Sequence, residues 1–283
     1  MKRADVGARM ESSVEIDGVR LTYDDEGQGP VLLCLHAIGH GARDFEGLRA
    51  QFKDRYRVIA LDWPGQGNSG ADRVSASAAR YAELLAGFIE ALDLHSVIVL
   101  GNSIGGAAGI LYTHGHPKNV SGLVLVNTGG LDRFDTLTLI FTGAMAAFFR
   151  AGARGARWFP AAFALYYRMI LPGRPARKQR DRIVACARES APALTEAWTS
   201  FGKESADLRT HVRELACPVL VAWAKSDRIN QFKRNLPAIR SIPNARVETF
   251  PGGHAPFLEC PEKFMPSLAS FLSEVAKQQL AHI

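Results

Sequence analysis

The sequence has 283 residues, of which 47% are hydrophobic and 22% charged, and its formal net charge is +6 at pH 7. These proportions exclude a disordered or collagen-like chain and allow one large or two small globular domains. Residues 1–13 lack the apolar run of a secretory signal, and we expect no stretch that is long and apolar enough to cross a membrane. The four cysteines have neither metal-site nor disulfide spacing, so a reducing cytoplasm is the expected compartment.

Alternating and continuous apolar runs predict strands and helices in regular succession. After a loose tail over residues 1–11, Asp17-Gly18 separates two alternating segments, which predicts a hairpin. The later strands are continuous apolar runs, as expected where helices cover both faces of a sheet. We expect strands at 13–17, 19–23, 31–35, 57–61, 96–101, 121–127, 218–223 and 245–250, and helices at 43–53, 76–93, 103–112 and 261–277.

This alternation predicts an α/β protein with a mostly parallel eight-stranded sheet and helices on both faces. Residues 131–213 interrupt the alternation, because they contain few strand-like runs and many Ala, Arg, Phe and Leu. We therefore expect a core domain made of residues 12–130 and 214–283. Residues 131–213 are expected to form a helical cap over the carboxyl edge of the sheet.

A short motif follows the predicted strand at 96–101. The run Gly101-Asn102-Ser103-Ile104-Gly105 has the G-x-S-x-G pattern of a nucleophile elbow, in which a sharp strand-to-helix turn exposes the serine. The serine at such an apex has a strained backbone, and a side chain at Gly101 or Gly105 would crowd it. An ordinary Gly-rich turn fits the same five residues, so the rest of the chain must decide between the two interpretations.

Further motifs occur in order around this turn. They are a loop with His36 after the third strand, the segment from Asp62 to Ser69 (D-W-P-G-Q-G-N-S) after the fourth, an acid after the seventh, and Gly252-Gly253-His254 after the eighth. In this order of motifs the chain resembles the α/β-hydrolase family over nearly its whole length. The resemblance implies the α/β-hydrolase fold, a cap inserted after strand six, and a serine nucleophile.

The candidate catalytic residues are Ser103, Asp227 and His254, in the order that the family uses. Each follows a predicted strand, and reactive groups collect at the carboxyl ends of strands in an open α/β sheet. A histidine can take the serine proton, and a carboxylate can fix the tautomer of the imidazole and stabilise its cation. Taken singly, Asp227 fits a surface turn and His254 a packing role. Asp132 is the competing acid, but residues 128–131 separate it from the sixth strand.

The resemblance also implies an oxyanion hole made of two backbone N–H groups, those of Ile38 and Ile104. This chain departs from the family pattern in the first of the two loops. The usual His-Gly pair is replaced by His36-Ala37, so the conformation of this loop is less well determined by the resemblance.

Two residues, His40 and Asn102, are predicted to line the substrate pocket, with a solvated loop position as the alternative for His40. Asn102 beside the nucleophile, and the run Gly129-Gly130-Leu131, also resemble the hydrolases that cleave C–C bonds in meta-cleavage products. Two departures count against this alternative. Gly39-His40 replaces the usual Gly-Pro, and Ala255 follows His254 where those enzymes usually have Trp.

The predicted cap is strongly basic. Between residues 141 and 190 there are ten basic and two acidic residues, which gives +8 while the whole chain is +6. A lid with solvated arginines accounts for this charge; the alternative is a surface for an anionic partner or substrate tail, such as an acyl carrier protein, an anionic membrane or an acidic substrate. No nucleic-acid reader motif accompanies it. The basic residues are Arg150, Arg154, Arg157, Arg168, Arg174, Arg177, Lys178, Arg180, Arg182 and Arg188.

The sequence therefore predicts a serine hydrolase that cleaves small-molecule carboxylic esters through an acyl-enzyme intermediate, with no cofactor or metal. C–C bond hydrolysis is the alternative reaction, and a non-catalytic ligand-binding homologue is the third reading. A serine at the elbow argues against the dehalogenase and epoxide-hydrolase branches, which use an aspartate there. Acyl and alcohol specificity and oligomeric state do not follow from the sequence.

Overall fold

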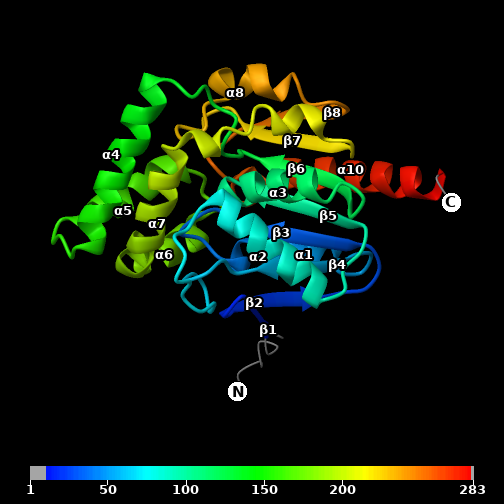
Figure 1. The fold of residues 1–283 in the computed structure, drawn as a ribbon, viewed down its shortest axis with the longest axis horizontal. Helices are drawn as coiled ribbons and strands as arrows, with labels where there is room; N and C mark the ends of the chain where they lie inside the picture. Colours follow the sequence, from blue (N-terminus) through cyan, green and yellow to red (C-terminus); the bar gives the residue numbers. More distant parts are fainter. Residues whose placement is uncertain (1–10, 282–283) are drawn as a thin grey trace.

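The computed structural model describes residues 11–281 and contains one eight-stranded sheet (Figure 1). The strand order is β1-β2-β4-β3-β5-β6-β7-β8. The order places β3 and β5, which are followed by the His36 loop and by Ser103, side by side near the middle of the sheet. The strands are β1 (Glu11–Ile16), β2 (Val19–Glu26), β3 (Val31–Leu35), β4 (Arg57–Leu61), β5 (Val97–Asn102), β6 (Val120–Val126), β7 (Val219–Ala224) and β8 (Ala245–Phe250).

Strand direction follows the predicted pattern. β1 pairs antiparallel with β2 in the register Ser13↔Thr22, and Asp17 and Gly18 both have positive φ, as a tight hairpin turn requires. β2 is antiparallel to β4, and β3 to β8 are parallel to their neighbours. All six residues of β5 and of β7 are buried, because helices cover both faces of the central sheet. The predicted fold class is confirmed.

The helices of the core agree with the sequence pattern except in three places, one of which is the four-residue helix at Pro256–Glu259, which was not predicted. The helix expected at 43–53 is divided into a 3₁₀ turn, η1 (Ala42–Phe45), and the short helix α1 (Glu46–Phe52). Helix α8 (Phe232–Ile239) had no counterpart in the sequence prediction, since Pro237 lies inside it and the segment has few apolar residues. The remaining core helices are α2 (Ala78–Ala91), α3 (Ile104–Gly115), α9 (Pro256–Glu259) and α10 (Pro261–Ala281).

Four helices connect β6 to β7 in the segment expected to form the cap: α4 (Thr136–Ala153), α5 (Phe159–Ile170), α6 (Arg177–Ala185) and α7 (Ala187–Phe201). Two short 3₁₀ turns, η2 (Glu204–Ala206) and η3 (His211–Glu214), lead back to the sheet. Helix α4 packs along α7, and both lie beyond one end of the strands of the sheet (Figure 1). The division of the chain into a core domain and a cap at residues 131 and 213 stays a prediction. The turn η3 ends one residue after the second of these boundaries.

The sequence predicts no stretch long and apolar enough to cross a membrane, and one helix of the structure meets that description by length and composition alone. Among the residues that the structure describes, α4 has 18 residues and a mean hydropathy of 1.3, and only 22% of it is buried. One such helix is weak evidence for a span, because helices of soluble proteins meet the same criteria. What α4 does present is an apolar surface that the fold leaves largely uncovered.

Candidate active site

Ser103 occupies a strained turn between β5 and α3. Its φ of 56° and ψ of −117° are rare for a residue with a side chain. The predicted crowding at the neighbouring glycines is confirmed. A Cβ on Gly101 would lie 2.5 Å from backbone atoms of Gly105 and Gly106, and a Cβ on Gly105 would lie 2.4 Å from the carbonyl oxygen of Leu35. The turn therefore tolerates only glycine at these positions, and it presents the serine beyond the strand end.

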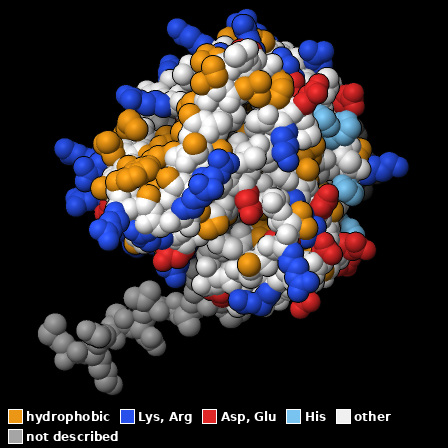
Figure 2. Space-filling model, turned by 60° about the vertical axis from the view of Figure 1, so that its left-hand side comes forward, with side chains coloured by type: hydrophobic (Ala, Val, Ile, Leu, Met, Phe, Trp, Pro, Cys, Tyr) orange, Lys and Arg blue, Asp and Glu red, His pale blue; other side chains and the backbone are white. Residues whose placement is uncertain are grey.

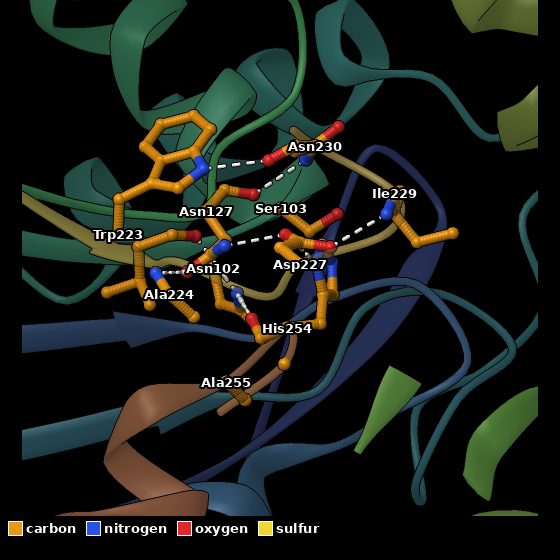
Figure 3. Close-up of polar contacts among 12 residues, drawn as sticks. Asn102, Ser103, Asn127, Trp223, Ala224, Asp227, Ile229, Asn230, His254 and Ala255 are labelled. Atoms are coloured by element: carbon orange, nitrogen blue, oxygen red, sulfur yellow. Dashed lines mark hydrogen bonds and ion pairs between the residues drawn. The ribbon is translucent and has the colours of Figure 1, made fainter. Parts of the chain in front are cut away.

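His254 and Asp227 are joined at the same edge of the sheet, close to Ser103 (Figure 3). His254 Nδ1 donates to Asp227 Oδ2 over 2.8 Å, and both side chains are buried. Because a carboxylate only accepts, Nδ1 carries a proton, and in the neutral imidazole Nε2 then keeps its lone pair. Within residues 11–281 no hydrogen bond joins Ser103 Oγ to His254, which is common in unliganded sites. The competing acid, Asp132, does not contact His254.

Asp227 is held by donors that the sequence analysis did not identify. Asn127 Nδ2 donates to Asp227 Oδ2 over 2.5 Å, and the backbone N–H of Ile229 donates to Oδ1 over 2.8 Å. Asn127 is itself fixed, since its Oδ1 accepts from Ala224 N and its backbone carbonyl accepts from Asn230 Nδ2 (Figure 3). With both oxygens occupied by donors, the carboxylate is held in one orientation. An asparagine directly after the sixth strand was the available signal.

Asn102 lies behind the site and not in a substrate pocket, which corrects the prediction made for it. It is fully buried, and its Nδ2 donates to the carbonyls of Val126 (2.9 Å) and His254 (3.0 Å). As the last residue of β5, it points to the opposite side of the strand end from Ser103. The side chain therefore positions the histidine loop instead of contacting substrate.

Two backbone N–H groups near Ser103 are free to bind an anion. In the part of the chain that the structure describes, neither Ile38 N nor Ile104 N donates a hydrogen bond. Ile104 begins α3, so its N–H also lies at the positive end of a helix dipole. The adjacent Gly39 N donates to Gln66 Oε1 over 2.6 Å, which anchors the loop.

His36 supports this loop, as predicted. Its Nε2 accepts from Trp63 N (2.9 Å), its backbone carbonyl accepts from Trp63 Nε1 (2.9 Å), and its Nδ1 donates to Ala37 O (2.7 Å). Complete burial lowers the pKa of His36, chiefly through desolvation, so the imidazole stays neutral and Nε2 keeps the lone pair that holds Trp63. The Ala37 methyl fits this arrangement. Ala37 is buried, and its carbonyl accepts the backbone hydrogen bond from His40 N over 3.2 Å that closes the turn.

The model of the alpha/beta hydrolase family matches residues 32–266, which is most of the chain. The chain belongs to the alpha/beta hydrolase family. It is 27% identical, over 92% of its length and 93% of the relative's, to a 2-hydroxy-6-oxononadienedioate/2-hydroxy-6-oxononatrienedioate hydrolase of Paraburkholderia xenovorans. It is 26% identical, over 91% of its length and 79% of the relative's, to an uncharacterized protein of Mycobacterium tuberculosis. Its fold is similar to that of a thermophilic esterase from Thermogutta terrifontis, with a TM-score of 0.78, 24% identity, and coverage of 93% and 97% of the two chains.

This alpha/beta hydrolase has a cavity of about 70 Å³ in front of Ser103. It is lined by Ile38 and Ser103, by Phe141 of α4 and Trp198 of α7, and by Ile229. Asp132 also lines it, but Arg234 Nε donates to both of its carboxylate oxygens over 2.8 Å. The lining is mainly apolar, and the volume is small beside the 300–1,000 Å³ or so of most ligand pockets, so in this arrangement it accepts a short apolar group.

His40 lines a different cavity, between the oxyanion loop and helices α6 and α7, so its assignment to the Ser103 pocket is corrected. His40 does not line the cavity in front of Ser103, and it is not a solvated loop residue, because it is buried. His40 Nδ1 donates to Asp44 Oδ2 over 2.5 Å, its ring lies against Tyr167, and Gln179 of α6 donates to the other oxygen of Asp44. The residue belongs to a buried contact between core and cap.

Glu259 is a second buried acid near the site that the sequence analysis missed. Its Oε1 accepts from Gly173 N (2.9 Å), in the loop between α5 and α6, and its Oε2 accepts from Gly253 N (2.8 Å) and Ala255 N (3.4 Å). Burial raises the pKa of this carboxyl, and the three N–H donors act in the opposite direction. One side chain thus connects the loop that carries His254 to the cap.

Proposed function

We propose that this alpha/beta hydrolase cleaves carboxylic esters with Ser103 as nucleophile, His254 as general base and acid, and Asp227 as the residue that orients the histidine. The observation that carries the proposal is the hydrogen bond from His254 Nδ1 to Asp227, which leaves Nε2 as a base at the edge where Ser103 is presented. The unpaired N–H groups of Ile38 and Ile104 support it further.

In the proposed reaction, Ser103 Oγ attacks the ester carbonyl while its proton passes to His254 Nε2. The negative charge that develops on the carbonyl oxygen is stabilised by the N–H groups of Ile38 and Ile104. His254 then protonates the leaving alcohol, and the acyl group remains on Ser103. Water, deprotonated by His254, attacks the acyl-enzyme, and the serine recovers its proton as the carboxylic acid leaves.

Hydrolysis of a C–C bond is the second candidate, and one observation favours it. The Paraburkholderia xenovorans relative is named as a hydrolase of a 2-hydroxy-6-oxo-dienedioate, and it matches this chain over 93% of its own length. Asn102, which carries part of the resemblance to the C–C hydrolases, bonds to the His254 backbone and does not line the cavity, so it gives no direct support for either reaction.

Ester turnover is tested with p-nitrophenyl acetate and butyrate, comparing the wild type, Ser103→Ala and the control Ser273→Ala, an exposed serine of α10 away from the site. We expect Ser103→Ala to lose at least about 10³-fold in kcat and the control to keep its rate. A fluorophosphonate should label the wild type at Ser103 alone. Equal rates in wild type and Ser103→Ala overturn the proposal. Decay of a 2-hydroxy-6-oxo-dienoate chromophore far faster than any ester favours the C–C candidate.

A further inference from the structure

The cap carries an apolar surface that nothing in the described chain covers. Its residues lie on α4, at the residue that precedes α5 and along α5, and between 40% and 65% of each residue is exposed. Exposed apolar residues of this size are normal when scattered, but a contiguous group marks a binding surface. We call the following five residues the cap face: Leu137, Ile140, Trp158, Leu165 and Met169.

Helical spacing puts these side chains on one strip of each helix. On α4, Leu137 and Ile140 are followed at positions 144 and 147 by exposed alanines, at i, i+3, i+7 and i+10. On α5, Trp158, Leu165 and Met169 stand at i, i+7 and i+11. Neither strip is needed for packing within the cap, since the buried faces of both helices are formed by other residues.

The two strips are neighbours. The ring of Phe148, half-buried on α4, lies 5.8 Å from the ring of Trp158 and 6.1 Å from that of Tyr166 on α5. The cap face therefore extends across both helices. It borders the active site as well, because Phe141, next to Ile140, lines the Ser103 cavity.

Positive charge surrounds this apolar surface. Residues 136–180 contain no Asp or Glu and eight Arg or Lys. Arg157 precedes Trp158, Arg168 precedes Met169, and Arg154 follows the end of α4; all three are exposed and form no ion pair with a described residue. Figure 2 shows hydrophobic side chains gathered on one face with Lys and Arg side chains around them. Unpaired arginines at the rim of an exposed apolar surface are complementary to anionic headgroups above acyl chains.

We infer that the cap face docks on the surface of an anionic phospholipid bilayer, with Trp158 and its apolar neighbours at the acyl boundary and Arg154, Arg157 and Arg168 on the headgroups. Helices α4 and α5 then lie in the plane of the interface, which explains an apolar helix that is only 22% buried without a membrane span. The inference does not depend on ester hydrolysis.

Tryptophan fluorescence can report on lipid binding, because only one of the four tryptophans is exposed. Trp63 and Trp223 are fully buried, Trp198 is 8% exposed, and Trp158 is 54% exposed. Full-length Ser103→Ala protein, which carries no turnover, is mixed with vesicles of phosphatidylglycerol and phosphatidylcholine or of phosphatidylcholine alone. We expect co-sedimentation and a blue shift of the emission with the anionic vesicles, both weakened by salt. Trp158→Phe should still sediment but lose the shift.

Two sets of variants localise the contact. Changing Ile140, Trp158 and Leu165 to Ser should abolish binding, and Gln at Arg154, Arg157 and Arg168 should weaken it roughly fivefold for each charge removed. Two matched controls change exposed residues elsewhere and should bind as before. The apolar control is the double variant Val74→Ser and Val247→Ser, and the charge control places Gln at Lys118, Arg240 and Lys277.

Three results would overturn the inference. The first is the absence of both sedimentation and a Trp158 shift with anionic vesicles. The second is equal binding to neutral and anionic vesicles. The third is a lipid-free dimer that already shields Trp158, which would assign the cap face to a second copy of the chain. Thermal unfolding of each variant verifies that it is folded.

Discussion

Asn102 Nδ2 donates a hydrogen bond of 3.0 Å to the backbone carbonyl of His254, although the two residues are 152 positions apart in the chain. The same amide nitrogen donates to Val126 O, so one buried side chain connects the ends of β5 and β6 to the loop after β8. This contact fixes the distance from the elbow to the histidine. Asn102 is therefore a positioning residue for the proposed base.

We predict that Asn102→Ala lowers kcat while KM changes little, because the His254 carbonyl loses its donor and the imidazole loses its fixed position. The His254 carbonyl left without a donor should also cost about 1–3 kcal/mol of folding stability, whereas Val126 O keeps the Ser103 backbone N–H as a donor. The matched control is Asn119→Ala, which removes hydrogen bonds to Leu94 O and Tyr112 Oη far from the site. That variant should lose stability but keep kcat. Equal kcat in Asn102→Ala and the wild type would contradict the positioning role.

Substitution of Asp227 and of Asp132 by Asn should have very different effects on kcat. Asp227→Asn should lower kcat by a factor of about 10⁴, because an amide favours the wrong imidazole tautomer at Nδ1 of His254. Asp132→Asn should lower it by less than about tenfold, since Asp132 pairs with Arg234 at a partly exposed position. Steady-state ester kinetics with both variants checks this prediction. A larger loss in Asp132→Asn would transfer the role of the triad acid to that residue.

Features of the fold and of the candidate site could be predicted from the sequence where they depend on residues close together in the chain. The strands, the hairpin at Asp17-Gly18 and the strained turn at Ser103 follow from periodicity and glycine placement, and the structure agrees with each. The positions of Asn102 and His40 do not, because their partners lie far away in the chain or in the cap. The role of Glu259 was hidden for the same reason.

The elbow glycines give a stability prediction. Gly101→Ala should destabilise the protein by about 3 kcal/mol or more, because its Cβ would meet rigid backbone atoms of Gly105 and Gly106 at 2.5 Å. Gly47→Ala is the control, since Gly47 is exposed within α1 and nothing lies within 4 Å of a Cβ there. That change should stabilise by about 0.5–1 kcal/mol. Urea denaturation measures both, and similar midpoints for the two variants would contradict the steric argument.

Glu259 gives a pH dependence with a definite sign. Burial raises its pKa in the folded chain, so the folded state binds the proton more tightly than the unfolded state does. Its contribution to stability is present below the unfolded pKa and is lost as the pH rises through the folded pKa. Glu259→Gln lacks this titration, and its NH₂ group cannot accept from one of the N–H donors, which should cost about 1–3 kcal/mol.

We therefore expect Glu259→Gln to be less stable than the wild type at about pH 4, close to the usual pKa of a glutamate, and the gap to narrow as the pH rises toward neutrality. Urea unfolding of both proteins across this range measures the gap. The control Glu204→Gln, at an exposed acid, should show no such trend. A gap that stays constant would mean that the pKa of Glu259 is the same in the folded and unfolded chain, and a gap that widens with pH would mean that the three N–H donors outweigh burial; either result contradicts the prediction.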